Sequence, residues 1–306
     1  MLFLQKDGKG RGSHPMYLCL EEGGTAHGVY LHNSNAMEIF LRGQPSVTYK
    51  VYGGRLEFYV FMGPTPADVV RQYLELVGKP AMPPFWGFGY HLSRDGNWSL
   101  RSMKQIVQRN RQDLFPLESI GAGIESYTKD LHTFTLMNGR DWSDFRTQLD
   151  KTGQKILMEA PPYVLPIKGE RAYDVGLSEK KFVMDPNTGK LAMCKVENDI
   201  GINATYVDFT ADDVSFYWTN TLRNVRAFAQ YDGIWLTHTS PQCIRQSPGE
   251  CPSTTQDLIR RPPEALDLHT LCMDTTFAYF KHFNIHNLYG YYAAKVANLA
   301  SNGASV

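Results

Sequence analysis

Apolar and polar positions alternate along the first part of the chain. Between residues 16 and 62, β-branched and aromatic residues alternate with polar ones in segments such as "SVTYKVYGG" and "RLEFYVFMG". This period of two predicts strands of an antiparallel sheet or sandwich. In "TPADVVRQYLELVG" the apolar residues recur at helical spacing between a capping Thr65 and a closing Gly78, which predicts a helix. The Pro-rich "KPAMPP" that follows is typical of a linker and predicts a boundary between residues 1–80 and 81–306.

Strands and helices alternate beyond that boundary. Four apolar segments predict strands, at 85–92, 119–126, 155–161 and 232–239. Amphipathic segments predict helices near 101–113, 141–152, 212–230 and 275–300. This alternation favours an α/β fold with a parallel sheet, whose functional site lies at the carboxyl ends of the strands. We therefore expect Glu125, Glu159 and the segment Thr237–Ser240, which end three of the strands, at the site.

Composition limits the classes of partner. The 306 residues contain 31 Lys+Arg and 31 Asp+Glu, so no net field attracts the chain to nucleic acid or to an anionic membrane. A hydrophobic content of 42% is enough for a real core, and no apolar run reaches the roughly 18 residues that span a bilayer. The opening "MLFLQKDGKG" is too short and too soon polar for a secretory signal, so we expect either an intracellular chain or a missing N-terminus.

Cofactor and metal motifs are absent from the sequence. The five cysteines, at positions 19, 194, 243, 251 and 272, include no CxxC pair, and no HExxH occurs. We therefore predict no metal site and no cofactor. The segment "MDPNTG" at 184–189 lacks the spaced oxygen ligands of a calcium loop and predicts a turn. Sequons at Asn97 and Asn203 predict N-glycosylation if the chain is secreted.

Several long segments occur in an order that resembles one enzyme family. They are "GVYLHNSNAME", "GGRLEFYVFMGPTPADVVRQYLELVGKPAMPPFWGFGYHLSR", "TYVDFT", "DGIWL" and "HFNIHNLYGYYAAKV". Together they make the chain similar to glycoside hydrolase family 31, the α-glucosidase family. The resemblance implies a partial (β/α)8 TIM-type barrel of about the first four strands, preceded by a β-sandwich remnant. It also implies an α-glucan or maltose-type sugar as the ligand.

The nucleophile that the resemblance implies is missing. A retaining glycosidase needs two carboxyl groups, one as nucleophile and one as proton donor. The family carries its nucleophilic aspartate in a W-[IL]-D-M-N-E segment, and the matching segment here is Trp235–Ser240, with Thr237 at the aspartate's place. A Thr hydroxyl has no charge to stabilise an oxocarbenium ion, and it is not readily activated without an adjacent base. We therefore predict that the nucleophile position is degenerate and the chain catalytically inactive.

Other segments of the pocket differ as well. The family shows D-[IL]-D-Y-M where this chain has Gly123–Tyr127, an Asp-Pro pair where it has Pro161-Pro162, and K-V-W-P-G where it has Lys195–Asn198. Asp208 and Asp232 remain from the family framework, and we interpret them as hydrogen-bonding residues. Because the chain stops at Val306, before the family's proton-donor region, we expect half a barrel. Its open sheet edge then predicts a protein partner or self-association.

Three functions stay open on the sequence. The first is an inactive family-31 protein with a scaffold or partner-binding role. The second is a weak carbohydrate-binding module in the old cleft. The third is an active glycosidase with a rebuilt pair of carboxylates, Glu125 and Glu159. His238 and Ser240 also share a strand face, but no third group orients them, so we favour an inert strand end over a Ser–His nucleophile.

The resemblance also implies a disulfide between Cys251 and Cys272. A crosslink that closes about 20 residues contributes roughly 3 kcal/mol by loop entropy. Cys19, Cys194 and Cys243 have no evident partners in the sequence. The resemblance places the chain in the secretory pathway, lysosomal or extracellular. Two free thiols in a reducing cytosol stay the alternative, because no signal peptide is visible.

Overall fold

Antiparallel strands make up the N-terminal part of the chain. The computed structural model describes residues 14–43, 46–94, 98–128, 134–135, 139–196, 202–244, 251 and 270–302. The chain divides into two units, Met1–Pro83 and Pro84–Val306. In the first unit, β1 (Met16–Leu20), β2 (Ala26–Leu31) and β5 (Phe58–Phe61) form an antiparallel sheet in the order β1-β2-β5. A separate antiparallel hairpin joins β3 (Met37–Arg42) to β4 (Ser46–Val51).

The helix α1 (Pro66–Val77) packs on this three-stranded sheet. The Thr65 hydroxyl accepts the Asp68 N–H at 3.2 Å and the Asp68 carboxylate accepts the Thr65 N–H, which makes a capping box. Val69 is fully buried, and a side chain at Gly28 would stand 2.6 Å from Val69 Cγ1, so glycine permits the close contact. The predicted apolar face is narrower than expected, because Val70 and Val77 are exposed.

A four-stranded parallel sheet forms the centre of the second unit. Its strands are β6 (Tyr90–Leu92), β7 (Leu117–Ala122), β8 (Lys155–Ala160) and β12 (Gly233–Leu236), in the order β12-β8-β7-β6. The connecting helices are α2 (Leu100–Gln112), α4 (Gly139–Asp150) and α6 (Val214–Ala229), and α9 (Tyr289–Asn302) follows β12. This α/β arrangement confirms the parallel sheet preceded by antiparallel strands that the sequence predicts.

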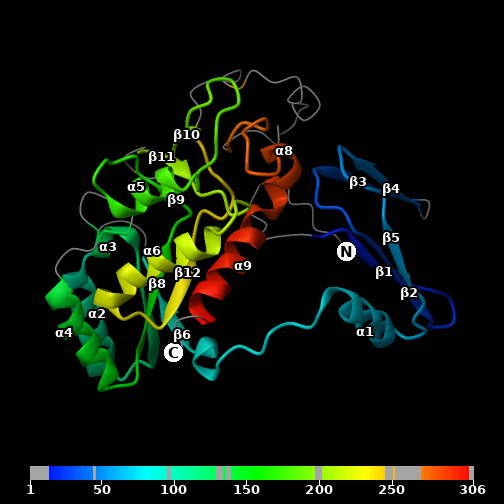
Figure 1. Ribbon diagram of the computed structural model, residues 1–306. Helices are drawn as coiled ribbons and strands as arrows, with labels where there is room; N and C mark the ends of the chain where they lie inside the picture. Colours follow the sequence, from blue (N-terminus) through cyan, green and yellow to red (C-terminus); the bar gives the residue numbers. More distant parts are fainter. Residues whose placement is uncertain are drawn as a thin grey trace. The chain divides into compact units, whose positions relative to one another are not determined.

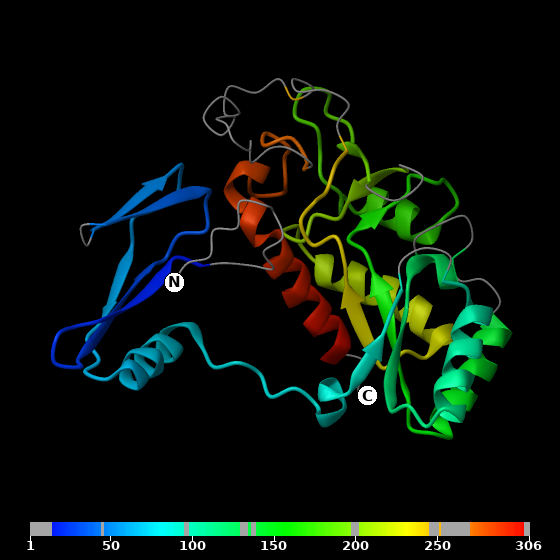
Figure 2. The ribbon, with the colours of Figure 1, turned by 180° about the vertical axis from the view of Figure 1, so that it is seen from behind.

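The helices cover one face of the parallel sheet. Figure 1 shows α2 and α4 beside β7 and β8, and Figure 2 shows α9 beside β12 from behind. Ile120, Ile156 and Met158 point to the helix side and are almost fully buried. Leu157 and Glu159 alternate with them and point to the opposite face, where both are only half-buried. That opposite face corresponds to the interior of a barrel.

A second, smaller sheet lies outside the predicted pattern. The strands β9 (Tyr163–Val164), β10 (Met193–Lys195) and β11 (Asn203–Tyr206) form an antiparallel sheet in the order β10-β11-β9. The helix α5 (Arg171–Ser178) lies between β9 and β10 in the chain and contacts α6. These strands have two to four residues each, which is too few for a period of two to be recognised.

Three predicted elements end or begin elsewhere. The segment 85–92 is a strand only from Tyr90, because Phe85–Phe88 forms a 3₁₀ turn after two prolines. The segment 119–126 leaves the sheet after Ala122 and turns into α3 (Ile124–Tyr127), so Glu125 lies on a short helix. The segment 275–300 is helical only from α8 (His282–Ile285), through a 3₁₀ turn at His286–Leu288, into α9. Thr276 instead forms bridges with Met184 and Lys281.

Asp232 fixes the amino end of the sheet. Its Oδ2 accepts the Ile156 N–H at 2.9 Å and a hydrogen bond from the Arg146 guanidinium, and its Oδ1 lies 3.5 Å from Lys155 Nζ. Arg146 comes from α4 and is almost fully buried. Asp232 therefore ties β12 to β8 and to α4 at the end opposite the expected site, as a framework residue would.

Candidate functional site

Glu159 lies at the carboxyl end of β8 and is held by two neighbouring segments. Its Oε2 accepts the Ile124 N–H at 2.8 Å, and its Oε1 accepts the Thr237 hydroxyl at 2.6 Å. The parallel register pairs Glu159 with Trp235, so a residue two positions after Trp235 comes within reach of the carboxylate. The carboxylate therefore joins the ends of β7, β8 and β12.

Thr237, which the sequence analysis expects at the place of the family's nucleophile, is a hydrogen-bond donor. The sequence analysis names an adjacent base as the condition for activating this hydroxyl, and the Glu159 carboxylate lies 2.6 Å from it. The same carboxylate also accepts the Ile124 N–H through its Oε2. The contact therefore fixes the orientation of the Thr237 hydroxyl at the end of β12.

Tyr127 is a buried hydrogen-bond donor beside Glu159. Its hydroxyl donates to the Glu159 backbone carbonyl at 2.7 Å, and the side chain is fully buried. Burial, together with the negative charges of Glu159 and Glu125 and two neighbouring tyrosines, raises the pKa of Tyr127 well above its usual value. The phenol is thus neutral at every physiological pH and acts as a fixed donor.

Glu125 stands at the same end of the sheet as Glu159. It lies in the first turn of α3, and a side chain at Gly123 would come within 2.9 Å of its Oε2, so the carboxylate folds back over Gly123. The next residue, Ile124, donates its N–H to Glu159. The geometry therefore brings together Glu125, Glu159 and Thr237, three of the residues that the sequence analysis singled out.

His238 contacts a side-chain amide and an aromatic ring. His238 has a left-handed backbone with φ 49°, and its Nδ1 lies 2.8 Å from the Gln242 side-chain oxygen. Its ring makes an edge contact with Tyr163 at 5.6 Å between centroids. These contacts fix the orientation of the His238 ring at the end of β12, and the inert strand end stays a prediction.

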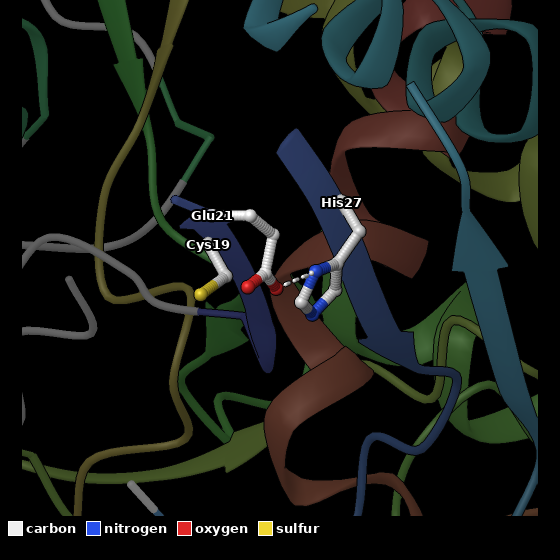
Figure 3. Close-up of side chains that lie close together, drawn as sticks. All are labelled: Cys19, Glu21 and His27. Atoms are coloured by element: carbon white, nitrogen blue, oxygen red, sulfur yellow. Dashed lines mark ion pairs between the residues drawn. The ribbon is translucent and has the colours of Figure 1, made fainter. Parts of the chain in front are cut away.

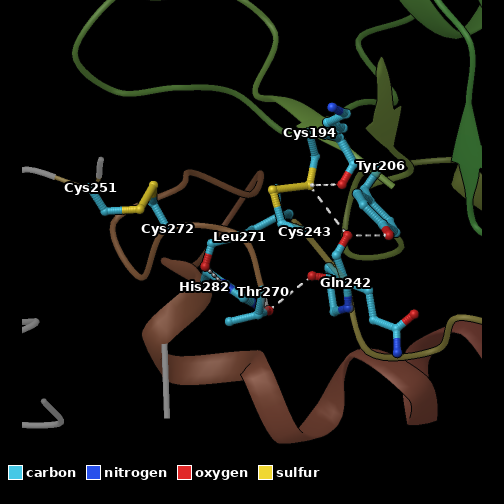
Figure 4. Close-up of a disulfide and its surroundings, with 11 residues drawn as sticks. Cys194, Tyr206, Gln242, Cys243, Cys251, Thr270, Leu271, Cys272 and His282 are labelled. Carbon is cyan, nitrogen blue, oxygen red and sulfur yellow. Dashed lines mark hydrogen bonds between the residues drawn. A yellow bond between two sulfur atoms is a disulfide. The ribbon is translucent and has the colours of Figure 1, made fainter. Parts of the chain in front are cut away.

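Two disulfides fix the loops after β12, as Figure 4 shows. Cys251 and Cys272 are bonded, which is the pair that the resemblance implies. Cys194 of β10 is bonded to Cys243, a pair that the sequence analysis missed. The two cysteines are 49 positions apart and give no sequence signal, and only the fold brings β10 next to the segment after β12. The neighbouring Gln242 carbonyl accepts the Tyr206 hydroxyl at 2.7 Å, so the segment after Thr237 is held on both sides.

Asp208 and Asp185 organise loops in this unit. Asp208 is almost fully buried, and it accepts the N–H and hydroxyl of Thr210 and the N–H of Ala278. Burial raises the pKa of its carboxyl against the opposing effect of these donors. The Asp185 carboxylate accepts the Asn187 N–H and the Thr188 hydroxyl, both at 2.9 Å, and this makes the predicted turn.

The two sequons differ in what can be said of them. Asn97 lies outside the described residues. Asn203 is exposed at the start of β11, whereas Thr205 of the same sequon is fully buried. An enzyme that must contact Thr205 therefore acts before β11 is folded. The glycosylation of Asn203 stays a prediction.

One cluster of ligand-type side chains occurs among the residues that the structure describes. It consists of Cys19, Glu21 and His27 and lies in the N-terminal unit. The sequence analysis missed it because the spacing of the three residues matches no metal motif. Across all the residues that the structure describes, no helix has the length and apolar character needed to cross a membrane.

A parallel sheet with helices on one face and polar side chains at its carboxyl ends is the arrangement of part of a TIM-barrel domain. Residues 80–305 match the family model described as "Glycosyl hydrolases family 31 TIM-barrel domain". The chain therefore belongs to glycosyl hydrolase family 31, as its sequence segments suggest.

Curated relatives of the chain are much longer than it is. Mouse lysosomal alpha-glucosidase is 35% identical over 292 residues, which cover 91% of this chain and 30% of the relative. Human probable maltase-glucoamylase 2 is 34% identical over 297 residues, which cover 94% of this chain and 12% of the relative. The chain thus spans less than a third of the length of these two relatives.

Solved structures share the fold. The glucosidase II alpha subunit, in an "alpha3-Glc2-bound" form, matches with a TM-score of 0.76 at 20% identity over 94% of this chain and 31% of that one. A dextranase of the same family from Flavobacterium johnsoniae, solved with isomaltotriose, matches with a TM-score of 0.72 at 19% identity over 91% of this chain and 32% of that one. At these identities the likeness concerns the fold alone.

Proposed function

We propose that this chain is a catalytically silent family-31 module. The hydrogen bond from the Thr237 hydroxyl to Glu159 carries this proposal, because it involves the residue that stands at the nucleophile position. A retaining mechanism requires a carboxylate there to attack the sugar and to stabilise an oxocarbenium-like transition state. A neutral hydroxyl supplies no charge for this stabilisation, and it must lose its proton before it can attack.

The change at β7 supports the same conclusion. The family carries a sugar-binding aspartate where this chain has Gly123, and here Gly123 is the N-cap of α3. The first free N–H of α3, on Ile124, is satisfied by Glu159 rather than by a ligand. The hydrogen bonds of Glu159 thus hold strand ends together. A carboxylate engaged in this way is less free to act on a sugar.

An aryl α-glucoside assay tests the proposal. Purified chain is expected to release no more aryl alcohol than a buffer blank, over a range of pH, while mouse lysosomal alpha-glucosidase serves as the active control. Turnover above the blank would contradict the proposal. The variants Glu125→Gln and Glu159→Gln then identify its source.

The rebuilt pair of carboxylates is the alternative that the geometry favours most. Glu125 lies close to Gly123, and Glu159 accepts the N–H of the next residue, Ile124, so both carboxylates lie near the end of β7. If the two act together, each Gln variant abolishes turnover alone, because an acid and a base or nucleophile are both required. Turnover that survives in both variants excludes the pair.

Carbohydrate binding without catalysis is the second alternative. Trp235 is 36% exposed and belongs to the sheet face opposite the helices, where an indole can stack on a sugar ring. Isothermal titration with maltose measures such binding. A heat of binding that disappears in Trp235→Ala, but remains in the exposed α6 variant Phe216→Ala, would support this function.

A secretory compartment is part of the proposed function. Four of the five cysteines form disulfides, which form and persist in oxidising compartments. Non-reducing peptide mapping of chain made in such a compartment should recover both bridged peptides. If all four cysteines were alkylated as free thiols, the secretory assignment would fail.

A further inference from the structure

The β1–β2 hairpin gathers three ligand-type side chains on one face. Cys19 and Glu21 are two residues apart, so their side chains point to the same side of the strand. Antiparallel pairing places His27 directly opposite Cys19. Cross-strand partners share a face, so His27 joins the other two. Figure 3 shows Glu21 and His27 pointing toward each other with the Cys19 sulfur beside the carboxylate.

The distances within this cluster suit a metal ion. The Cys19 Sγ, a Glu21 carboxylate oxygen and a His27 ring nitrogen all lie within 4.8 Å of one another, and His27 Nδ1 is 2.8 Å from Glu21 Oε1. Zinc binds sulfur at about 2.3 Å and nitrogen or oxygen at about 2.0–2.2 Å. Tetrahedral geometry then separates the ligand atoms by roughly 3.3–3.7 Å, so small side-chain rotations are sufficient.

The chemistry of the three ligands is selective. Cys19 is the free cysteine of the described residues, whereas the other four cysteines are consumed by disulfides. Thiolate, imidazole and carboxylate together favour a borderline-soft cation such as Zn²⁺ over Ca²⁺ or Mg²⁺, which prefer oxygen alone. Cys19 and His27 are half-buried and Glu21 is exposed, so an ion can enter from solvent.

We propose that Cys19, Glu21 and His27 form a Zn²⁺ site in the N-terminal unit, with water as a fourth ligand. On binding, the Cys19 thiol gives up its proton and coordinates as thiolate, and the displaced proton leaves to solvent. His27 stays neutral and presents Nδ1 to the ion, with its proton on Nε2. The hydrogen bond between His27 and Glu21 is exchanged for two bonds to the metal.

The same unit contains a matched control. His32 Nδ1 lies 3.6 Å from Glu57 Oε1, which makes a second His–Glu pair on the neighbouring strand segment. The cluster of potential ligands found among the described residues does not include this pair. The His27–Glu21 pair has the Cys19 thiol beside it, so we expect zinc to bind there and not at the His32–Glu57 pair.

Two measurements on the full chain test the site. Competition with a chromophoric zinc chelator gives the affinity, and Co²⁺ substitution reports the ligands, because a thiolate bound to Co²⁺ produces a charge-transfer band in the near ultraviolet. The wild type should bind one Zn²⁺ and show the band. Cys19→Ser and His27→Gln should each weaken zinc binding by at least about tenfold, since loss of even an outer-shell partner costs 10–100-fold in known sites. Cys19→Ser should also remove the band, and His32→Gln should change neither.

Several results would overturn the proposal. They are the absence of zinc binding in the wild type, an affinity that is unchanged in Cys19→Ser and His27→Gln, or an equal loss in His32→Gln. Circular dichroism of each variant without metal shows whether the hairpin unit is still folded. These outcomes do not depend on catalysis, because the cluster and Thr237 lie in different units.

Discussion

The Thr237 hydroxyl is central to the proposed function of the carboxyl end of the parallel sheet. Thr237 and Glu159 are 78 residues apart in the sequence and meet through a 2.6 Å hydrogen bond. The sequence locates both residues at strand ends, but their contact depends on the register between β8 and β12, which no local pattern contains. The sequence therefore predicts a Thr at the nucleophile position, and this stays a prediction, whereas the hydrogen bonds of Glu159 could not be predicted.

Removing the Thr237 hydroxyl should destabilise the chain. Thr237→Val keeps the shape of the side chain but leaves Glu159 Oε1 without this donor, which costs about 1–2 kcal/mol for a half-buried carboxylate. Thr237→Ser retains the hydroxyl and should lose less. Urea unfolding of the two variants measures the difference. Equal stabilities would mean that the hydrogen bond contributes nothing to the fold.

At the scale of the elements, two predicted segments differ from the structure because long-range hydrogen bonds change where they begin or end. The strand pattern of residues 119–126 runs on into α3, because apolar residues alone do not reveal that Glu159 satisfies the Ile124 N–H. The helical pattern of residues 275–300 hides the bridges of Thr276, which are long-range contacts with Met184. In both cases a tertiary hydrogen bond overrides the local preference.

The two disulfides should differ in their contribution to stability. Loop-closure entropy gives about 4 kcal/mol for a separation of 49 residues and about 3 kcal/mol for 21 residues. The double variant Cys194→Ala/Cys243→Ala should therefore melt below Cys251→Ala/Cys272→Ala, and the second pair serves as the control for the first. The opposite order in calorimetry would indicate that packing, not loop closure, determines their effect.

Asp208 should make stability depend on pH. Burial raises the pKa of its carboxyl, so the folded chain holds this proton more tightly than the unfolded chain. The contribution is fully present below the unfolded pKa of about 3.9 and is lost as pH rises through the folded pKa. The Asn of Asp208→Asn cannot titrate. The unfolding free energy of the wild type minus that of the variant should therefore fall as pH rises from about 4 to about 7. A difference that is constant over this range would contradict the assignment.

At the scale of the whole molecule, the order of the elements was more predictable than the site. Apolar segments that extend beyond the strands themselves, separated by amphipathic helices, predict the parallel sheet. The small sheet of β9, β10 and β11 and the Cys194–Cys243 bridge left no such signal, since they join short segments that are distant in the sequence. Both contact Gln242 and Cys243 after β12, so the sequence was least informative next to the candidate site.

The edges of the parallel sheet predict self-association. In the described residues β6 and β12 are its outermost strands, and Tyr90 of β6 is exposed. Unpaired edge strands bind further strands unless charge or proline protects them. Light scattering should show association that grows with concentration, and Tyr90→Lys should reduce it more than Leu299→Lys on the exposed side of α9. A monodisperse monomer at all concentrations would contradict this prediction.

Covalent trapping tests the central claim most directly. An epoxide analogue of an α-glucoside forms an ester with a carboxylate that acts as a glycosidase nucleophile, and intact mass spectrometry detects the adduct. Mouse lysosomal alpha-glucosidase provides the labelled control. With Thr237 at the nucleophile position, this chain should gain no mass under conditions that label the control fully. An adduct that maps to Glu125 or Glu159, and that disappears in the corresponding Gln variant, would show that the chain has rebuilt its active site.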